Sequence, residues 1–89
     1  MANYLEPPGQ TKEKFLAEKG TVVEAKEMHT LLNDPVNIGI CLVNNGMWNA
    51  AMIVQDARNA NDCTNPNERR ERRFYSVPRA DLKAIGYTI

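Results

Sequence analysis

The chain of 89 residues has few of the side chains on which catalysis and metal binding depend. It contains one histidine, two cysteines and one tryptophan, and aromatic residues make up only 7% of the sequence. One histidine and two separated cysteines lack the paired spacing of a zinc site, and neither Gly39 nor Gly46 belongs to a phosphate-binding loop motif. We therefore expect no metal, no cofactor and no enzyme activity.

The sequence also has no excess of charge of either sign. Eleven lysines and arginines balance eleven aspartates and glutamates, so the formal net charge is zero. Proteins that bind nucleic acid mainly through its phosphates usually carry a positive excess. Any binding of nucleic acid therefore has to be local rather than a property of the whole surface.

Long apolar runs and a dense set of cysteines are missing as well. No apolar run approaches the ~20 residues that cross a bilayer, and no charged-then-apolar leader opens the sequence. We therefore expect a cytoplasmic protein that does not enter a membrane, in the host cytoplasm if a phage encodes it. Cys41 lies in an apolar run and Cys63 in a polar one, which predicts free thiols, with a disulfide between them as the minor alternative.

What the sequence does contain is typical of one small globular domain. Hydrophobic residues make up 43% and charged residues 25% of the chain, an ordinary composition for a folded protein. We expect a single domain over residues 1–89, with residues 1–10 as an extended N-terminal arm. The Pro7-Pro8-Gly9 break favours no regular structure there, and Tyr4 and Leu5 are candidates to pin the arm.

Capping signals predict a first helix over residues 11–19. Thr11 offers a hydroxyl that can accept a hydrogen bond from a free backbone amide at the helix start. Gly20 can adopt the left-handed conformation that commonly ends a helix. Phe15 and Leu16 are then expected to face inward.

A second helix is predicted over residues 22–33. The segment Thr21–Glu24 matches the capping box, in which a threonine and a glutamate satisfy each other's free backbone amides. A strand over residues 21–25 is the competing interpretation, because the Thr-Val-Val run favours β structure.

A β-hairpin is expected at the centre of the sequence. Asn45-Gly46 is the preferred pair for a two-residue type I′ turn, in which both residues need a positive φ. That turn places Val43 opposite Trp48. Because side chains alternate along a strand, one face carries Ile38, Ile40, Leu42, Met47, Ala51 and Ile53, and the other carries Gly39, Cys41, Val43, Trp48, Ala50 and Met52.

Both faces of this hairpin are apolar, although a small antiparallel sheet usually leaves one face in water. Either helices cover both faces, or one face binds a partner or a second copy of the chain. The face with Gly39, Cys41 and Ala50 around Trp48 is the better candidate, since small residues leave a recess beside a large aromatic side chain. Two alternatives stay open: Trp48 belongs to the core, or residues 47–58 form a helix.

The last third of the chain is expected to hold a loop, a strand and a helix. The Asn-rich segment 59–68 is predicted to be a loop that contacts a partner or lies in solvent. A third strand is expected over residues 72–77, beside the hairpin. Pro78 favours a helix over residues 78–85 that Gly86 ends, and the final Tyr-Thr-Ile can form a short edge strand.

These elements predict an α+β fold: a small antiparallel sheet built on the central Asn-Gly hairpin, with two to three short helices packed on it. Several arginines lie beside aromatic residues near the third strand. They could pair with carboxylates of another protein, or hold phosphates while an aromatic ring stacks on a base. The predicted partner-binding residues are Trp48, Asn61, Asn65, Arg69, Arg70, Arg72, Arg73 and Tyr75.

A non-catalytic protein-binding module is the function that these features favour. A one-domain binder without chemistry of its own resembles, in kind, the small accessory proteins that bacteriophages use to block host or defence machinery, including anti-CRISPR proteins. That resemblance implies a protein or nucleoprotein complex as the partner.

Three other functions stay open. The first is binding of nucleic acid or nucleotides through Arg69–Tyr75. The second is a self-associating accessory subunit, a homodimer formed through the face that carries Gly39 and Trp48. The third is a small enzyme that uses His29 with one of the cysteines, because catalytic partners meet in space rather than in sequence.

Overall fold

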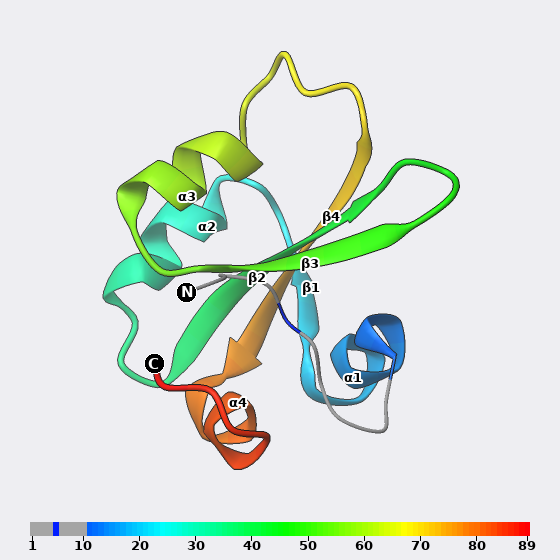
Figure 1. Ribbon diagram of the computed structural model, residues 1–89. Coiled ribbons are helices and arrows are strands. Elements are labelled where there is room, and N and C mark those ends of the chain that lie inside the picture. The colour runs from blue at the N-terminus through cyan, green and yellow to red at the C-terminus, as the bar shows by residue number, and fades with distance from the viewer. Residues whose placement is uncertain (1–4, 6–10) are drawn as a thin grey trace.

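The computed structural model of the protein describes Leu5 and residues 11–89 (Figure 1). A four-stranded antiparallel sheet runs through the molecule in the order β1-β4-β2-β3. The α+β class is confirmed. In chain order the elements are α1 (Lys12–Lys19), β1 (Thr21–Val23), α2 (Glu27–Thr30), the 3-10 helix η1 (Leu31–Asn33), β2 (Asn37–Asn44), β3 (Asn49–Val54), α3 (Ala57–Cys63), β4 (Glu71–Pro78) and α4 (Arg79–Ala84).

Helices pack on both faces of the sheet, which forms the middle layer (Figure 1). α1 and α4 lie on one face, and α2 and α3 lie on the other. On the α1 and α4 side, the buried residues form the first core: Leu5, Phe15, Leu16, Ile38, Ile40, Leu42, Ala51, Ile53, Tyr75, Val77 and Leu82. On the α2 and α3 side, they form the second core: Met28, Leu31, Cys41, Val54, Ala60 and Cys63.

The β2–β3 hairpin is present, but its loop is longer than the predicted two-residue turn. Asn44 pairs with Asn49, so residues 45–48 form the loop. The Asn44 side-chain oxygen accepts a hydrogen bond from Gly46 N (2.6 Å), and Asn45 N donates to the Trp48 carbonyl oxygen (3.3 Å). Of the loop residues only Gly46 has a positive φ (91°), whereas a type I′ turn needs two.

The longer loop shifts the strand register by two residues and leaves the predicted faces intact. Val43 pairs with Ala50 instead of Trp48. Because the side-chain repeat of a strand is two residues, a shift of two returns each strand residue to its own face. Met47 and Trp48 are the exceptions, since both lie in the loop.

The first helix is confirmed. Gly20 follows it because of close packing, and not because of the predicted left-handed conformation. Thr11 Oγ1 accepts a hydrogen bond from Lys14 N (3.2 Å) and caps α1. Gly20 has an extended backbone (φ −101°) instead of a left-handed one. A Cβ at Gly20 would lie 2.8 Å from the Leu16 carbonyl oxygen and 3.2 Å from Tyr75 Cδ2, so close packing requires the glycine.

The predicted helix over residues 22–33 is wrong in its first half. Thr21–Val23 form β1, which pairs with β4, in agreement with the competing strand interpretation. Helix α2 begins only at Glu27 and continues as η1. The Glu27 carboxylate accepts a hydrogen bond from Glu24 N (2.9 Å) in the turn that precedes α2, whose N-cap residue Lys26 makes no side-chain capping bond.

One alternative and one prediction about the middle of the chain are wrong. The alternative of a helix over residues 47–58 fails because β3 occupies Asn49–Val54. The loop predicted over residues 59–68 fails in its first half because α3 extends to Cys63. Only residues 64–70 connect α3 to β4 without regular structure.

Helix α3 has a capping signal that its Asn-rich composition hides. The Asp56 side chain accepts a hydrogen bond from Asn59 N (2.8 Å) and satisfies a free amide at the helix start. Ala60 and Cys63 are buried against the sheet one turn apart. Their small side chains let a polar helix lie close to the second core.

The third strand and the last helix are confirmed as β4 and α4. Gly86 follows α4 with a positive φ of 106°, as expected at a helix end. The predicted edge strand at Tyr87–Ile89 is wrong, because Tyr87 N donates to the Leu82 carbonyl oxygen (3.1 Å) at the end of α4. The final residues pack against the first core instead.

Within the predicted N-terminal arm the structure describes Leu5, and the prediction for residues 1–4 and 6–10, which include Tyr4, lies outside the described residues. Leu5 is fully buried in the first core, as a pinning residue should be. Its amide donates to the Ala51 carbonyl oxygen (2.7 Å), which partly covers the outer edge of β3.

Candidate functional site

The face of the sheet on which α2 and α3 pack, here called the second face, is covered at one end and open to solvent at the other. A Cβ at Gly39 would lie 2.8 Å from Met28 Cε, and Cys41 has no exposed surface. The predicted partner surface is therefore wrong for Gly39 and Cys41, which the helices cover. Val43 and Ala50, nearer the hairpin loop, are only partly buried. α2 and α3 are short, and they leave this end of the sheet uncovered.

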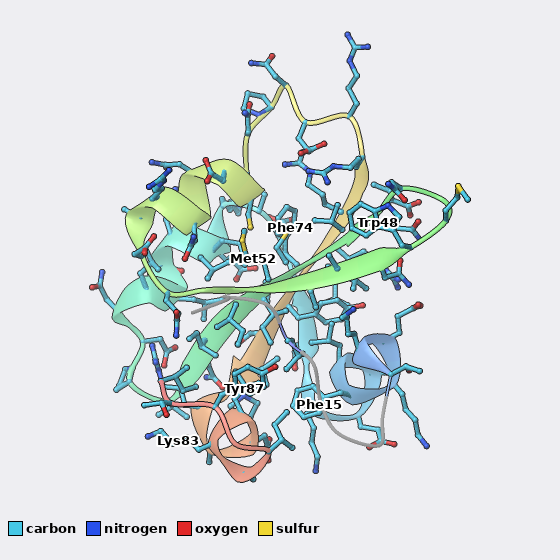
Figure 2. All side chains as sticks on the ribbon, viewed as in Figure 1. Phe15, Trp48, Met52, Phe74, Lys83 and Tyr87 are labelled. Carbon is cyan, nitrogen blue, oxygen red and sulfur yellow. The ribbon has the colours of Figure 1, made fainter. Side chains whose placement is uncertain are left out.

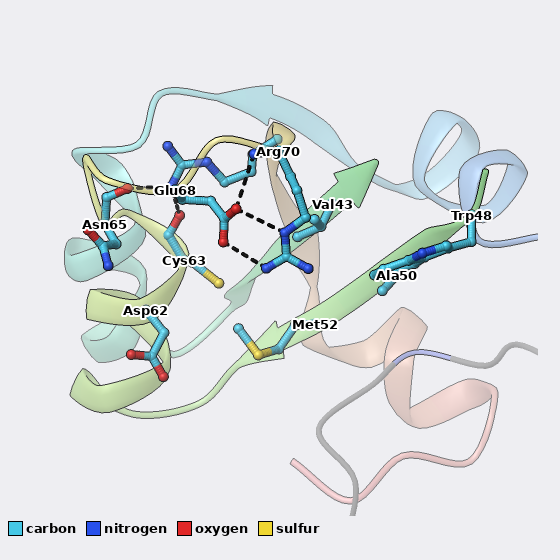
Figure 3. A pocket seen from close by; sticks show the side chains of 10 residues that line it. Val43, Trp48, Ala50, Met52, Asp62, Cys63, Asn65, Glu68 and Arg70 are labelled. Carbon is cyan, nitrogen blue, oxygen red and sulfur yellow. Dashed lines mark hydrogen bonds and ion pairs between the residues drawn. The ribbon is translucent and has the colours of Figure 1, made fainter. Parts of the chain in front are cut away.

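The open end of the second face contains a pocket of about 520 Å³ (Figure 3). The β2–β3 hairpin forms one side, and the end of α3 and the 64–70 loop form the other. The pocket is lined by Val43, Trp48, Ala50, Met52, Asp62, Cys63, Asn65, Glu68, Arg70 and Arg72.

The floor of the pocket is apolar, and one end is aromatic. Val43 of β2 lies beside Ala50 and Met52 of β3, and Cys63 of α3 is next to them. Trp48 flanks this floor at the hairpin end, with 47% of its surface exposed (Figures 2 and 3). An apolar floor beside a partly exposed indole favours a ligand that removes both from water.

An ion pair forms part of the pocket rim. Arg70 Nε donates to Glu68 Oε1 (2.9 Å), and Arg70 Nη2 donates to Glu68 Oε2 (2.7 Å). The Arg70 side chain stabilises the carboxylate and lowers the pKa of Glu68 to about 2. In Figure 3 the guanidinium group lies between the Glu68 carboxylate and Trp48, so a cation and an aromatic ring flank the same space.

Arg72 holds the opposite wall in place. Its Nη1 donates to the carbonyl oxygens of Cys63 and, at 3.1 Å, of Asn65. The guanidinium carbon also lies 5.8 Å from the centre of the Phe74 ring, within the range of a cation–π interaction. These contacts connect β4 to the end of α3 and to the 64–70 loop, so side-chain contacts within the chain hold the wall.

The pocket brings together several residues predicted to bind a partner. Trp48, Asn65, Arg70 and Arg72 all line it, although they come from the hairpin loop, the 64–70 loop and β4. Arg69 is exposed in the same loop but does not line the pocket.

Other predicted site residues lie elsewhere. Arg73 points to the opposite face, where its Nη2 is 3.7 Å from Glu13 Oε2. The Asn61 side-chain oxygen is 3.0 Å from His29 Nε2, an exposed contact between α3 and α2. Tyr75 is buried in the first core, so its ring is not available to stack on a base.

Sequence reasoning missed much of the pocket wall and floor. Ala50 was expected beside Trp48 on the candidate contact face. Val43 and Met52 were placed on the same face but not singled out, because nothing in the sequence indicated where the covering helices would end. The lining also includes Asp62, Cys63 and Glu68. They belong to the segment 59–68 that was predicted to contact a partner, but their positions depend on α3 and on the shape of the 64–70 loop.

The geometry weighs against a phosphate-binding surface. Arg72 and Arg73 are neighbours on β4 and therefore point to opposite faces of the sheet. Arg70 is paired with Glu68, and Asp62 adds a further negative charge to the pocket lining. The arginine-rich segment thus presents no continuous basic surface to a nucleic-acid backbone.

Over Leu5 and residues 11–89, no group of three or more His, Cys, Asp or Glu side chains is placed to hold a metal ion. Over the same residues, no helix is long and apolar enough to cross a membrane.

The titration of Glu68 tests the ion pair at the rim. We expect a wild-type midpoint near pH 2, and a rise toward the ordinary value of 4.5 in Arg70→Gln, because glutamine removes the charge that stabilises the carboxylate. Since the folded pKa is lowered, the stability from this pair is present above pH 4.5 and lost as the pH falls toward 2. Carbon-detected NMR of the carboxyl group measures both midpoints.

The matched control for this titration is Arg73→Gln on the opposite face, which should leave the Glu68 midpoint unchanged. A Glu68 midpoint that stays near pH 2 in Arg70→Gln would show that the rim pair is not the cause of the low pKa.

Comparison with known proteins supplies no family for this chain. No protein-family model matches it, and searches of curated proteins and of solved structures found no match either.

Proposed function

We propose that the protein is a non-catalytic protein-binding module whose pocket receives an aromatic side chain of a partner. The observation that carries the proposal is the partly exposed indole of Trp48 beside the apolar floor of Val43, Ala50 and Met52. Tryptophan and arginine are the residues most often responsible for binding energy at protein interfaces. Both types flank this pocket.

An aromatic side chain in the pocket matches the chemistry of the two groups that flank it, the Trp48 indole and the Arg70 guanidinium. A ring placed on the floor can stack on Trp48 in an offset or edge-to-face arrangement. The Arg70 guanidinium lies across the same space and can pack on the ring from the other side. Because Glu68 holds Arg70 in place, the cation loses little side-chain freedom on binding.

Contacts within the chain hold the wall and the floor of the pocket. Arg72 fixes the wall through the carbonyl oxygens of Cys63 and Asn65, and the floor consists of paired strands. A preformed site avoids the entropic cost of ordering loops on binding. The 64–70 loop, with Arg69 exposed, is then free to make further polar contacts around the rim.

Within this class we propose an inhibitor of host or defence machinery, of the kind that bacteriophages encode. Its target would be a protein or a nucleoprotein complex in the host cytoplasm. This finer assignment is supported by the small size of the chain and by the lack, over Leu5 and residues 11–89, of a group of side chains that could hold a metal ion. The identity of the captured partner tests it.

Affinity capture from a lysate of the native host tests the proposal. Wild type and Ala50→Arg are immobilised side by side, because an arginine at position 50 fills the pocket floor from an edge strand without entering either core. We expect wild type to retain a partner protein, and Ala50→Arg to retain about tenfold less of it or lower still, because a buried anchoring contact is lost. Thermal unfolding verifies that the variant is folded.

The control is Arg73→Ala, which lies on the opposite face and should retain the same partner as wild type. Nuclease treatment separates direct protein binding from binding through nucleic acid, and sedimentation detects a second copy as the occupant. Equal retention by wild type and Ala50→Arg would rule out the pocket as the binding site.

A further inference from the structure

The loop that joins β2 to β3 contains an exposed Asn45-Gly46 pair. No other asparagine of the sequence is followed by glycine. The pair lies between the paired strand residues Asn44 and Asn49, outside the ladder of the sheet. Asparagine is one of the thermolabile residues of proteins, and exposed loops open at little cost in free energy. The pair therefore combines a labile side chain with a backbone that can move.

The conformation of Gly46 leaves its amide nitrogen free to approach the Asn45 side chain. Gly46 has a positive φ (91°), and a Cβ added to it would meet no atom within 4 Å. Glycine also has no side chain that hinders rotation about its backbone bonds. The Gly46 nitrogen can therefore turn toward Cγ of Asn45 without a steric conflict.

Two local hydrogen bonds restrain this approach. Gly46 N donates to Asn44 Oδ1 (2.6 Å), which belongs to the last residue of β2. Asn45 Oδ1 accepts from Met47 N at 3.4 Å, which is longer than a typical N–H···O bond. Attack on Cγ requires the Gly46 nitrogen to lose its proton, so the bond to Asn44 slows the reaction. It does not prevent the reaction, because a single side-chain contact in a loop opens readily.

We propose that Asn45 is a spontaneous modification site, at which water converts the asparagine to aspartate and isoaspartate through a succinimide formed with Gly46. The inference rests on the hairpin loop and does not depend on what the pocket binds.

The chemistry balances with water as the only co-reactant. The Gly46 nitrogen gives its proton to water or hydroxide and attacks Cγ of Asn45. The N–Cγ bond forms, the Cγ–Nδ2 bond breaks, and ammonia leaves with a proton from solvent. Water then opens the succinimide at either carbonyl carbon. Cleavage of the N–Cγ bond gives aspartate, and cleavage of the bond to the Asn45 backbone carbonyl carbon gives isoaspartate. One water is consumed and one ammonia is released, and no atom is oxidised or reduced.

Conversion changes the loop that carries Trp48. Both products place a negative charge where the loop had a neutral amide. Isoaspartate also routes the main chain through its side-chain carbons, so the backbone of the loop gains a methylene group. Asn45 N donates to the Trp48 carbonyl oxygen (3.3 Å) across this loop, and a longer backbone alters that contact. The NMR signal of the Trp48 indole, which lines the pocket, should therefore shift on conversion.

Incubation of the full-length folded protein at mildly alkaline pH, followed by digestion and mass spectrometry, tests the proposal. We expect the peptide that contains Asn45 to gain the mass that separates a carboxylic acid from an amide. Electron-transfer fragmentation should identify isoaspartate at the same position. Asn67 is the control within the same chain, because it is exposed in another loop but precedes glutamate. It should convert at least about tenfold more slowly, since a side chain on the following residue hinders ring closure.

Two substitutions separate the chemistry from its restraint. Asn45→Gln keeps the amide on a longer side chain that cannot form a succinimide, so it should show no conversion at this position. Asn44→Ala removes the acceptor that holds Gly46 N and should speed conversion severalfold in the folded protein. In a synthetic peptide of residues 43–49 the same alanine should have little effect, because the peptide lacks the folded hairpin. Thermal unfolding verifies that both variants are folded.

The wild-type protein and the wild-type peptide decide the question whether or not the variants fold. If Asn45 stays unmodified in the folded protein while the same asparagine is fully converted in the peptide, the proposal is overturned. Equal conversion of Asn45 and Asn67 would also contradict it. Partner capture uses freshly prepared, unmodified protein, so this test and that of the binding function can fail separately.

Discussion

Replacement of Trp48 by alanine is expected to weaken binding of the captured partner by about 2 kcal/mol or more, roughly a thirtyfold rise in Kd. The indole is 47% exposed and flanks the apolar floor, so binding would bury the rest of its surface. Because Trp48 lies in the hairpin loop and outside both cores, the free energy of unfolding should change little. Isothermal titration calorimetry with the purified partner measures the loss.

The neighbouring Met47 provides the matched control. It lies in the same loop, is 95% exposed, and does not line the pocket. Met47→Ala should therefore change Kd by less than about threefold, as expected for a solvent-exposed contact at the rim. If Met47→Ala and Trp48→Ala weaken binding equally, the loop and not the pocket is the contact, and the pocket assignment fails.

Replacement of Ile40 by alanine is expected to lower the free energy of unfolding by about 2–5 kcal/mol, through lost burial and the cavity that remains. Ile40 is fully buried on β2 and is paired with Ile53 and with Tyr75 on its two sides. A domain of this size is only modestly stable, so such a loss removes a large part of the total. Urea denaturation measures it as a lower midpoint at an unchanged slope.

Val22→Ala is the control for this substitution. Val22 is also β-branched but is 66% exposed on the edge strand β1. Its replacement should cost less than about 1 kcal/mol, which is the span of strand preferences. Similar losses for the two variants would contradict the placement of the first core on the α1 and α4 side of β2.

The sequence was most informative about which strand residues share a face. The alternation of residues 38–43 and 50–53 survived an error in the hairpin register, because a shift of two residues preserves faces. The register itself depended on Asn45, which was expected to adopt a positive φ and does not. Local composition does not reveal that Asn44 and Asn45 stabilise a longer loop.

Helix boundaries were harder to predict, because tertiary contacts decide between competing local signals. Thr21–Glu24 satisfied a capping pattern, but pairing with β4 makes the first three of these residues a strand. In α3 the opposite occurred: an Asn-rich run with weak helix preference is held by the Asp56 cap and by burial of Ala60 and Cys63.

The candidate site could be predicted only in outline. An unpaired apolar surface near Trp48 followed from the two apolar faces of the hairpin, and the pocket lies at that end of the sheet. The covered part of the second face, at Gly39 and Cys41, could not be predicted, because it depends on how α2 and α3 pack. The separation of Arg72 from Arg73 follows from strand alternation once β4 is extended through both.

The central claim is that the open end of the second face binds an aromatic side chain, and titration with N-acetyl-tyrosinamide tests it most directly. Methyl and indole NMR signals of Val43, Ala50, Met52 and Trp48 report on the pocket. We predict saturable shifts confined to these signals, weaker shifts with N-acetyl-leucinamide, and none in Ala50→Arg. Absence of shifts at saturating ligand, or equal shifts with the leucine amide, would contradict the account.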